Sequence, residues 1–568
     1  MLGRVNPQRS LLEPGQLFGH LVTKGSFYEN LARCGHELIC DDDFAHLYAP
    51  SRGRPSIPPS VMMRALLLAT KDGTSDRESA RRSRVDLDWK AALGLDTDHP
   101  GIGATTLSLF RARIVLHDAD QALFRKTVAK AVEAELFPTK VLALIDSSPV
   151  LGAGAVKDTY ELVRSAMRRV VAAAGEDALS KSLRKSLRRY EAKPVIDWDD
   201  PEARARELSR MVTAATKLLA AVAERDEARE AAALLAAIVA QDVEIDEDSG
   251  EPRIRTGVAK DRIVSASDPE MRHGRKSSST RFDGHKLHVM EEESTEIILG
   301  IDVGAGNGAD NEHAAPLIEG ANEAGVEVQE VVGDMAYSDG DTREAVEAHG
   351  AKMIAKVRST FNAGCFPKTD FLIDPELLEA TCPAGEVSTD ARPGKDYKGR
   401  RVFTLFFEPE TCASCAIRSE CVRGTGARSI TLNVHEARLI KARAEQQRPS
   451  VKAKLRRRAV IERKIDHLHD LGAKKALYRG RRKTKLQALL AATVANFARL
   501  EVLGGLGRQT ADPAGRGSTF DRLRQCLRGL HSSKSEPLAP LKASLHPIHL
   551  NLQRMRCAFS DTLCCSLT

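Results

Sequence analysis

The sequence predicts an α/β fold in which a mixed sheet is flanked by helices. Two apolar runs, Val141–Asp146 and Val326–Asp334, each end in an aspartate and have the residue types of buried strands. Between them, His285–Met290 and Glu296–Asp302 are separated by a charged turn, Glu291–Ser294, which is typical of a hairpin. Helical stretches alternate with these strands, so helices can cover the faces of the sheet.

The composition indicates a soluble protein of several domains. The chain has 568 residues, of which 42% are hydrophobic and 29% are charged. These values exclude a disordered or membrane-embedded class. The first residues lack the apolar core of a secretion signal, so we expect a cytoplasmic protein.

The positive charge is concentrated in one segment. Residues 451–490 contain 14 lysines and arginines against three acids, a net charge of +11, whereas the whole chain carries only +7 and the remainder therefore −4. Such clustering is how surfaces that bind nucleic-acid phosphates are usually built, although a solvated charged helix remains the plain alternative. The candidate DNA-binding residues are Arg456, Arg457, Arg458, Lys464, Arg481, Arg482 and Lys483.

Short helices precede the first strand. An apolar helix at Val61–Leu68 follows two prolines, Ser75–Glu78 forms a capping box at the start of the next helix, and a further helix covers Thr106–Ile114. Tight turns and several arginines favour a helical DNA-binding domain at residues 55–136, after a lead-in at 1–54. A helical bundle with no DNA contact would have a similar pattern.

The other elements follow in a regular order. A helical insertion at residues 156–255 comes after the first strand, with alanine-rich helices at Met211–Ala223 and Ala231–Ala240. After the hairpin we expect a helix at 311–323, the strand ending at Asp334, a helix at 341–349, a strand at 352–357 and, much later, a helix carrying Glu462.

Three carboxylates are the candidate catalytic residues: Asp146, Asp334 and Glu462. Two aspartates at strand ends and a glutamate on a helix can build an oxygen-rich pocket for two divalent cations, and paired cations suit phosphodiester chemistry. Each residue also has a simpler explanation. The aspartates could cap a strand and a turn, and Glu462 could pair with Arg458 one helical turn before it. Asp302, at the end of the hairpin, is the main competitor as a metal ligand.

Cysteines form a second candidate site. Eleven cysteines in a cytoplasmic chain argue against a disulfide framework. The Cys412–Cys415 pair has the spacing of zinc ligands, and Cys382 and Cys421 can complete a tetrahedral structural site. Four reduced cysteines in a loose loop are the alternative.

Several short motifs in a fixed order resemble those of bacterial insertion-sequence transposases of the DDE class. The helices up to Ile114 resemble the N-terminal domain of InsH-type transposases. The other matching blocks are Ala143–Val150, Asp268–Glu270, Phe282–Lys286, Gly306–Asn307, Gly333–Tyr337 and Arg458–Arg463. Related families often have a tyrosine where this chain has Leu455 and a lysine where it has His469. These two departures concern auxiliary contacts to DNA and not the three acids.

The resemblance implies a ribonuclease-H-like catalytic core in which Asp146, Asp334 and Glu462 hold Mg²⁺ or Mn²⁺. It implies binding to the terminal inverted repeats of an insertion sequence, phosphodiester cleavage there and joining of the ends to target DNA, by a homodimer or higher oligomer. The corresponding domains are a core at 137–155, 256–359 and 450–503, the helical insertion, a Cys-rich insertion at 360–449 and a disordered tail at 504–568. An inactive DNA-binding repressor or architectural protein, and a metal-dependent nuclease without strand transfer, are the alternatives.

Overall fold

The structure is a computed structural model that describes residues 1–507 apart from 7–11, 13, 50–52, 278, 359–361, 363 and 398. Residues 1–507 form one compact unit. The tail predicted for residues 504–568 lies outside the described residues from position 508 onward. None of the described helices combines the length and the apolar character that a membrane span requires.

A mixed sheet forms the centre of the fold. β1 pairs antiparallel with β5 and parallel with β7, β5 pairs antiparallel with β6 and with the short β4, and β7 pairs parallel with β8. Its strands are β1 (Val141–Leu151), β4 (Arg272–Arg275), β5 (Arg281–Glu292), β6 (Ile298–Ala305), β7 (Val328–Val332) and β8 (Lys352–Ile354). With its flanking helices, this sheet is the predicted ribonuclease-H-like α/β fold, and the fold class is confirmed.

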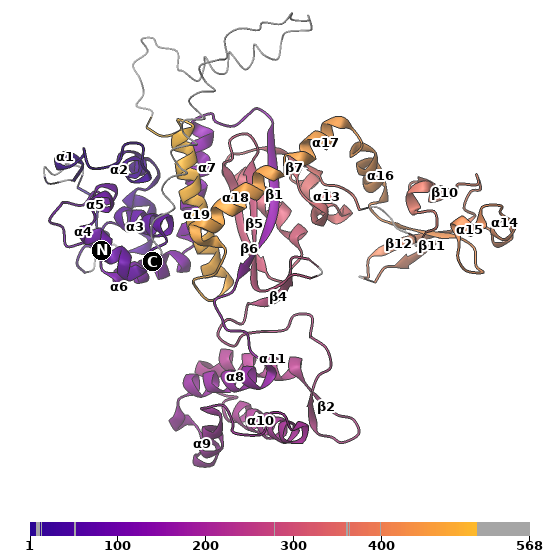
Figure 1. Ribbon diagram of the computed structural model, residues 1–568, viewed down its shortest axis with the longest axis horizontal. Coiled ribbons are helices and arrows are strands. Elements are labelled where there is room, and N and C mark those ends of the chain that lie inside the picture. Colours follow the sequence, from indigo (N-terminus) through magenta and orange to yellow (C-terminus); the bar gives the residue numbers. More distant parts are fainter. Residues whose placement is uncertain are drawn as a thin grey trace, which may run out of the picture. The chain divides into compact units, whose positions relative to one another are not determined.

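Helices cover the sheet on its faces and along one edge (Figure 1). α18 (Ala459–Leu468) contacts β1 and β5, and α12 (Ala314–Glu323) contacts β6 and β7. α19 (Arg481–Val502) runs beside the edge strand β6, where Asn496, which is fully buried, accepts from the N–H and donates to the carbonyl of Ile298. This pairing satisfies backbone groups that an open sheet edge would expose. The remaining helices of the core are α13 (Gly340–Ala348), α16 (Glu436–Glu445) and α17 (Pro449–Arg456).

The N-terminal part is helical. Its helices are α1 (Pro14–Leu17), α2 (Phe27–Leu38), α3 (Pro59–Asp72), α4 (Asp76–Val85), α5 (Leu87–Leu93), α6 (Ala104–Leu116) and α7 (Ala119–Glu133). The predicted cap is present, since the Ser75 hydroxyl accepts from the Glu78 N–H at 3.3 Å. Leu31 and Phe44 belong to the same apolar cluster as the buried face of α3. Residues 27–47 therefore pack against the helices that follow them.

The two insertions have cores of their own. The helical insertion contains α8 (Thr159–Ala174), α9 (Lys181–Leu187), α10 (Pro201–Ala221), α11 (Arg229–Asp242) and a small hairpin of β2 (Val243–Ile245) and β3 (Pro252–Ile254). The Cys-rich insertion contains β9 (Leu372–Asp374), β10 (Glu379–Thr381), β11 (Asp390–Lys395), β12 (Arg401–Phe406), α14 (Pro409–Ala413), α15 (Arg418–Cys421) and β13 (Ser429–Asn433). In this insertion, β11 pairs antiparallel with β12 and β12 pairs antiparallel with β13.

Candidate active site

The register of the central strands brings two of the predicted acids together. The parallel pairing of β1 with β7 places Leu144 beside Val332. Asp146 lies two residues after Leu144, and Asp334 lies two residues after Val332. The Gly333 N–H bonds to a carbonyl of β8, so the hydrogen bonding between β7 and β8 continues as far as Gly333. Because side chains alternate between the faces of a sheet, the two carboxylates lie side by side on the face that carries Leu144.

The sequence pattern predicted that Asp146 ends its strand. In the structure, Asp146 lies inside the strand. β1 continues to Leu151 because its pairing with β5 runs without interruption from Ala143 to that residue. Asp334 does lie just beyond β7, where it caps the short 3₁₀ helix η6 (Met335–Tyr337) by accepting from the Ala336 N–H at 2.7 Å. One acid is thus held by a continuous strand and the other by a capped turn.

The electrostatics of Asp146 favour a cation at this position. Its side chain is 16% exposed, accepts from the Ser147 N–H at 2.8 Å and lies 3.1 Å from the Arg458 guanidinium. Burial raises the pKa of Asp146, and the neighbouring Asp334 carboxylate raises it further, although the Ser147 N–H and Arg458 act in the opposite direction. A divalent cation shared by the two acids would remove this repulsion.

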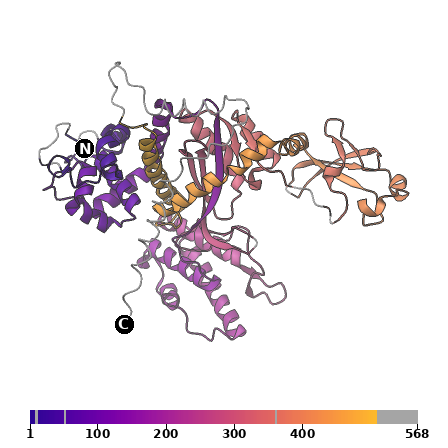
Figure 2. The same ribbon diagram turned by 45° about the horizontal axis from the view of Figure 1, so that its top comes forward.

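α18, which carries Glu462, lies against β1 and β5 of the sheet (Figures 1 and 2). Arg458, just before α18, contacts Asp146, and His469, just after it, contacts the Ser148 hydroxyl at 3.0 Å. At about 100° per residue, Arg458, Glu462 and His469 lie within roughly 40° of one another around the helix. Glu462 therefore lies on the same side of α18 as Arg458 and His469, the two residues that contact β1.

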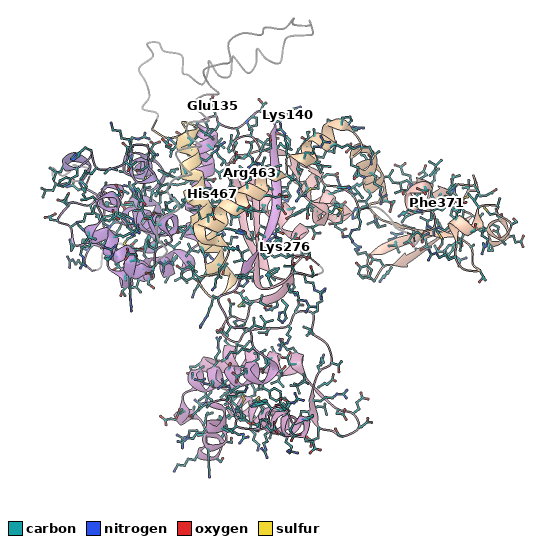
Figure 3. The ribbon with its side chains drawn as sticks, in the orientation of Figure 1. Glu135, Lys140, Lys276, Phe371, Arg463 and His467 are labelled. Carbon is teal, nitrogen blue, oxygen red and sulfur yellow. The ribbon has the colours of Figure 1, made fainter. Side chains whose placement is uncertain are left out.

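The structure brings Asp146 and Asp334 together but leaves the Glu462 side chain exposed and outside any ion pair of the described residues. Across the described ranges, no three His, Cys, Asp or Glu side chains already surround one metal position. Arg463 and His467, labelled in Figure 3, are exposed on the same helix. Completing a three-carboxylate site therefore requires Glu462 to turn toward the aspartates.

Two buried polar groups close to the aspartates have no hydrogen-bond partner in the described structure. They are the Tyr337 hydroxyl and the Nε of Arg458. Burial raises the pKa of Tyr337 well above its ordinary value, and Asp310, Asp146 and Asp334 add to this effect. Hard carboxylate oxygens with unsatisfied polar groups nearby fit a hydrated divalent cation, which prefers a few carboxylates plus water.

Asp302, the competing acid, belongs to the other face of the sheet. The antiparallel register aligns Asp146 with Val289 and aligns His288 with Asp302, so Asp302 and Asp146 point to opposite sides. Asp302 also binds Lys485 at 2.9 Å and His313 at 2.7 Å. Burial alone would raise the pKa of Asp302, but these two partners hold it well below its ordinary value. Asp302 is therefore a structural ion-pair residue and not part of the acid cluster.

Most of the candidate DNA-binding residues already have acidic partners. Lys464 is 7% exposed and pairs with Glu296, so its ammonium group is not available to a phosphate. The other paired residues are Arg457 with Glu293, Arg458 with Asp146, Arg481 with Glu270, and Arg482 with Asp118 and Asp120. Arg456 and Lys483 are exposed and make no ion pair within the described part of the chain.

Sequence reasoning missed a buried carboxyl beneath α18. Glu291 was expected in a charged turn, but β5 extends to Glu292 and Glu291 is fully buried, with neither oxygen hydrogen-bonded. Burial raises the pKa of Glu291 to about 8, and Glu296 and Glu292 raise it too, while Lys464 and Arg463 lower it. The turn itself is closed by Glu292, which accepts from the Thr295 N–H at 2.7 Å.

Replacing Glu291 by glutamine should change the pH dependence of stability. Between about pH 5 and about pH 8 the unfolded carboxyl is ionised while the buried one keeps its proton, so the unchanged protein loses up to about 1.4 kcal/mol of stability per pH unit. The Glu291→Gln variant has no carboxyl group that titrates at this position. Its stability relative to the unchanged protein should therefore increase as the pH rises through this window. Urea unfolding midpoints of both proteins over that range measure the difference, and parallel pH profiles would contradict it.

Four cysteines converge in the Cys-rich insertion. Cys382, Cys412, Cys415 and Cys421 are all partly buried, form no disulfide and line one cavity of about 80 Å³. Burial raises the pKa of the Cys421 thiol, and the other three cysteines also contribute to that increase. The predicted grouping of these residues is thus present as a shared cavity.

Comparison with known proteins identifies the class. A family described as "Transposase domain (DUF772)" matches residues 17–113, which cover the N-terminal helices, and a family described as "Transposase DDE domain" matches residues 381–501, which include Glu462 and α19. The two matches support a DDE-type transposase, in agreement with the resemblance found in the sequence.

More distant comparisons add little. No curated protein matches the chain. A cryo-EM structure of a piggyBac transposase synaptic complex with hairpin DNA is 11% identical and covers 76% of this chain and 88% of its own, with a TM-score of 0.14. A TM-score this low carries no argument.

Proposed function

We propose that this transposase binds the terminal inverted repeats of an insertion sequence, hydrolyses phosphodiester bonds at the element ends and joins the released 3′ hydroxyls to target DNA. Asp146, Asp334 and Glu462 are the catalytic residues, and together they hold two Mg²⁺ or Mn²⁺ ions. The observation that carries the proposal is the adjacency of Asp146 and Asp334 on the sheet face covered by α18. Bound there, the ions would supply charge stabilisation for both the attacking and the leaving oxygen.

The residues around the acids have supporting roles in this proposal. Arg458 holds the Asp146 carboxylate at 3.1 Å, and the His469–Ser148 contact fixes the other end of α18 against β1. Glu462 lies between these two contacts in the sequence of α18, and in this proposal its side chain turns toward the aspartates when the metal binds. The same anchoring restricts α18 to one position over the sheet, so the three acids can act on one scissile phosphate.

The proposal is tested with the purified chain and a duplex carrying the DNA that flanks its gene. Metal-dependent cleavage at the element ends, followed by their joining to a second DNA, is the expected result. Binding of the ends without cleavage in Mg²⁺ or Mn²⁺ would instead support the repressor or architectural alternative. Cleavage without joining would support a plain nuclease.

Exposed cations close to α18 should contribute to DNA affinity. Replacing Arg456 or Lys483 by alanine should weaken binding to element-end DNA and lower the slope of log K against log salt by about 0.9, because each loses one phosphate contact. Fluorescence anisotropy at several salt concentrations measures the slope. Arg392→Ala is the matched control, because this exposed arginine is already paired with Asp390. Equal slopes for all four proteins would show that Arg456 and Lys483 do not face phosphate.

A further inference from the structure

The Cys-rich insertion has a small apolar core. The buried members of its apolar cluster are Phe371, Ala380, Leu405, Phe407, Ile430 and Leu432. Phe371, labelled in Figure 3, lies within this unit. Its two small sheets, β9–β10 and β11–β12–β13, are separate. The cysteines of this insertion form no disulfide, and a bound metal is another means of stabilising a unit with few buried apolar residues.

The four converging cysteines come from two local structures that a metal could join. Cys382 begins a tight turn after β10, in which the Gly385 N–H bonds to the Cys382 carbonyl at 2.9 Å and the Cys382 N–H bonds to the Glu386 carbonyl at 2.8 Å. Gly385 has φ +90°, a conformation that favours glycine. The other three cysteines lie on α14, after it and on α15. Among the described residues, no backbone hydrogen bond joins this turn to α14 or α15.

The segment around Cys412 and Cys415 is held in shape by Arg418. Its guanidinium donates to the Cys412 carbonyl at 3.0 Å and to the Gly424 carbonyl at 2.9 Å, and its backbone N–H donates to the Cys415 carbonyl at 3.1 Å. These bonds fix the backbone on which the two thiols are carried. Thiol movement toward a metal then requires side-chain rotation rather than rebuilding of the chain.

We propose that Cys382, Cys412, Cys415 and Cys421 bind one structural Zn²⁺ that fastens the β10 turn to α14 and α15. Thiolate sulfur selects zinc over the hard cations that suit the acid cluster. In tetrahedral coordination the Zn–S bonds are about 2.3 Å, which places the sulfur atoms roughly 3.8 Å apart. The thiols line their cavity without surrounding one point among the described residues, so binding draws them inward. Four protein ligands leave no open position, and the zinc has no catalytic role.

The test measures metal content and thiol reactivity in the full-length protein. The unchanged protein should contain about one zinc per chain, and cobalt substitution should produce the absorption of a tetrahedral thiolate complex. Cys412→Ser/Cys415→Ser should lose the zinc and become sensitive to protease within residues 380–425. Cys365→Ser is the matched control, because Cys365 belongs to the same insertion but does not line the cavity.

Two further variants keep the proposal falsifiable if the double variant misfolds. Cys382→Ser alone should weaken zinc retention in the presence of a chelator, because it removes the ligand from the opposite side. Asp146→Ala should keep its zinc, which separates this site from the acid cluster. Freshly purified protein that contains no zinc, with all four thiols freely reactive, would overturn the proposal, as would full zinc retention by Cys412→Ser/Cys415→Ser.

Discussion

Alanine at Asp146, Asp334 or Glu462 should abolish metal-dependent cleavage and joining while leaving binding to element-end DNA nearly intact. A metal ligand contributes several kcal/mol of charge stabilisation in the transition state, so each variant should be slower by at least roughly 1,000-fold. DNA affinity comes mainly from lysine and arginine contacts to phosphate, which these changes leave in place. Single-turnover cleavage rates and anisotropy binding curves measure the two properties separately.

Asp302→Ala is the control for this expectation. Asp302 faces the other side of the sheet, so its loss removes the His313 and Lys485 ion pairs without touching the acid cluster. A folded Asp302→Ala variant should retain catalysis. Near-normal cleavage by any one of the Asp146, Asp334 or Glu462 variants would refute that residue's assignment.

Arg482→Ala should be the most destabilising of the changes in the basic segment. Arg482 donates to both carboxylate oxygens of Asp120, at 2.7 and 2.8 Å, and the Asp120 side chain is 1% exposed. Removing the arginine leaves a buried carboxylate without its partner, which costs about 3 kcal/mol. The contact joins α19 to α7, so the urea unfolding midpoint should fall. Lys483→Ala, an exposed neighbour without an ion pair, should change stability by less than about 0.5 kcal/mol.

A double variant separates loss of the pair from loss of the arginine itself. Asp120→Leu combined with Arg482→Met replaces the ion pair by apolar side chains of similar size and should recover most of the lost stability. If the double variant is as unstable as Arg482→Ala, the buried carboxylate is not the cause. If Arg482→Ala is fully stable but binds DNA weakly, Arg482 acts as a phosphate contact instead.

Local patterns were sufficient to predict the positions of β1, β5, β6 and β7, although not the end of β1 or the full extent of β5. Asp146 and Asp334 follow apolar runs whose period and composition are visible in a few residues, and their adjacency follows from parallel pairing of those runs. The N-cap at Ser75 is equally local, and its bond to the Glu78 N–H is present, whereas the Glu78 side chain pairs with Arg81 and Arg82 instead of completing the predicted capping box. The cysteine grouping was also predictable, because the spacing of Cys412 and Cys415 is a property of one short segment.

Features that depend on distant partners could not be predicted from the sequence. Arg482 and Lys464 looked like phosphate-binding residues, yet their partners lie in other elements, and Asp120 is 362 positions away from Arg482. Glu291 looked like part of a turn, and only the packing of α18 on β5 buries it. The face occupied by Asp302 depends on the register of β5 with β6, which a single sequence does not reveal.

The most direct test of the shared metal site is cleavage of the protein backbone by hydroxyl radicals produced at bound Fe²⁺. Iron that replaces the native cation cuts the chain close to its ligands, and this measurement does not depend on catalytic activity. If Asp146, Asp334 and Glu462 share one site, fragments should end near residues 146, 334 and 462, excess Mg²⁺ should suppress all three cuts together, and Asp146→Ala should remove them. Cuts near residue 302, or cuts near 146 and 334 that persist without any near 462, would contradict the assignment of these three acids to one site.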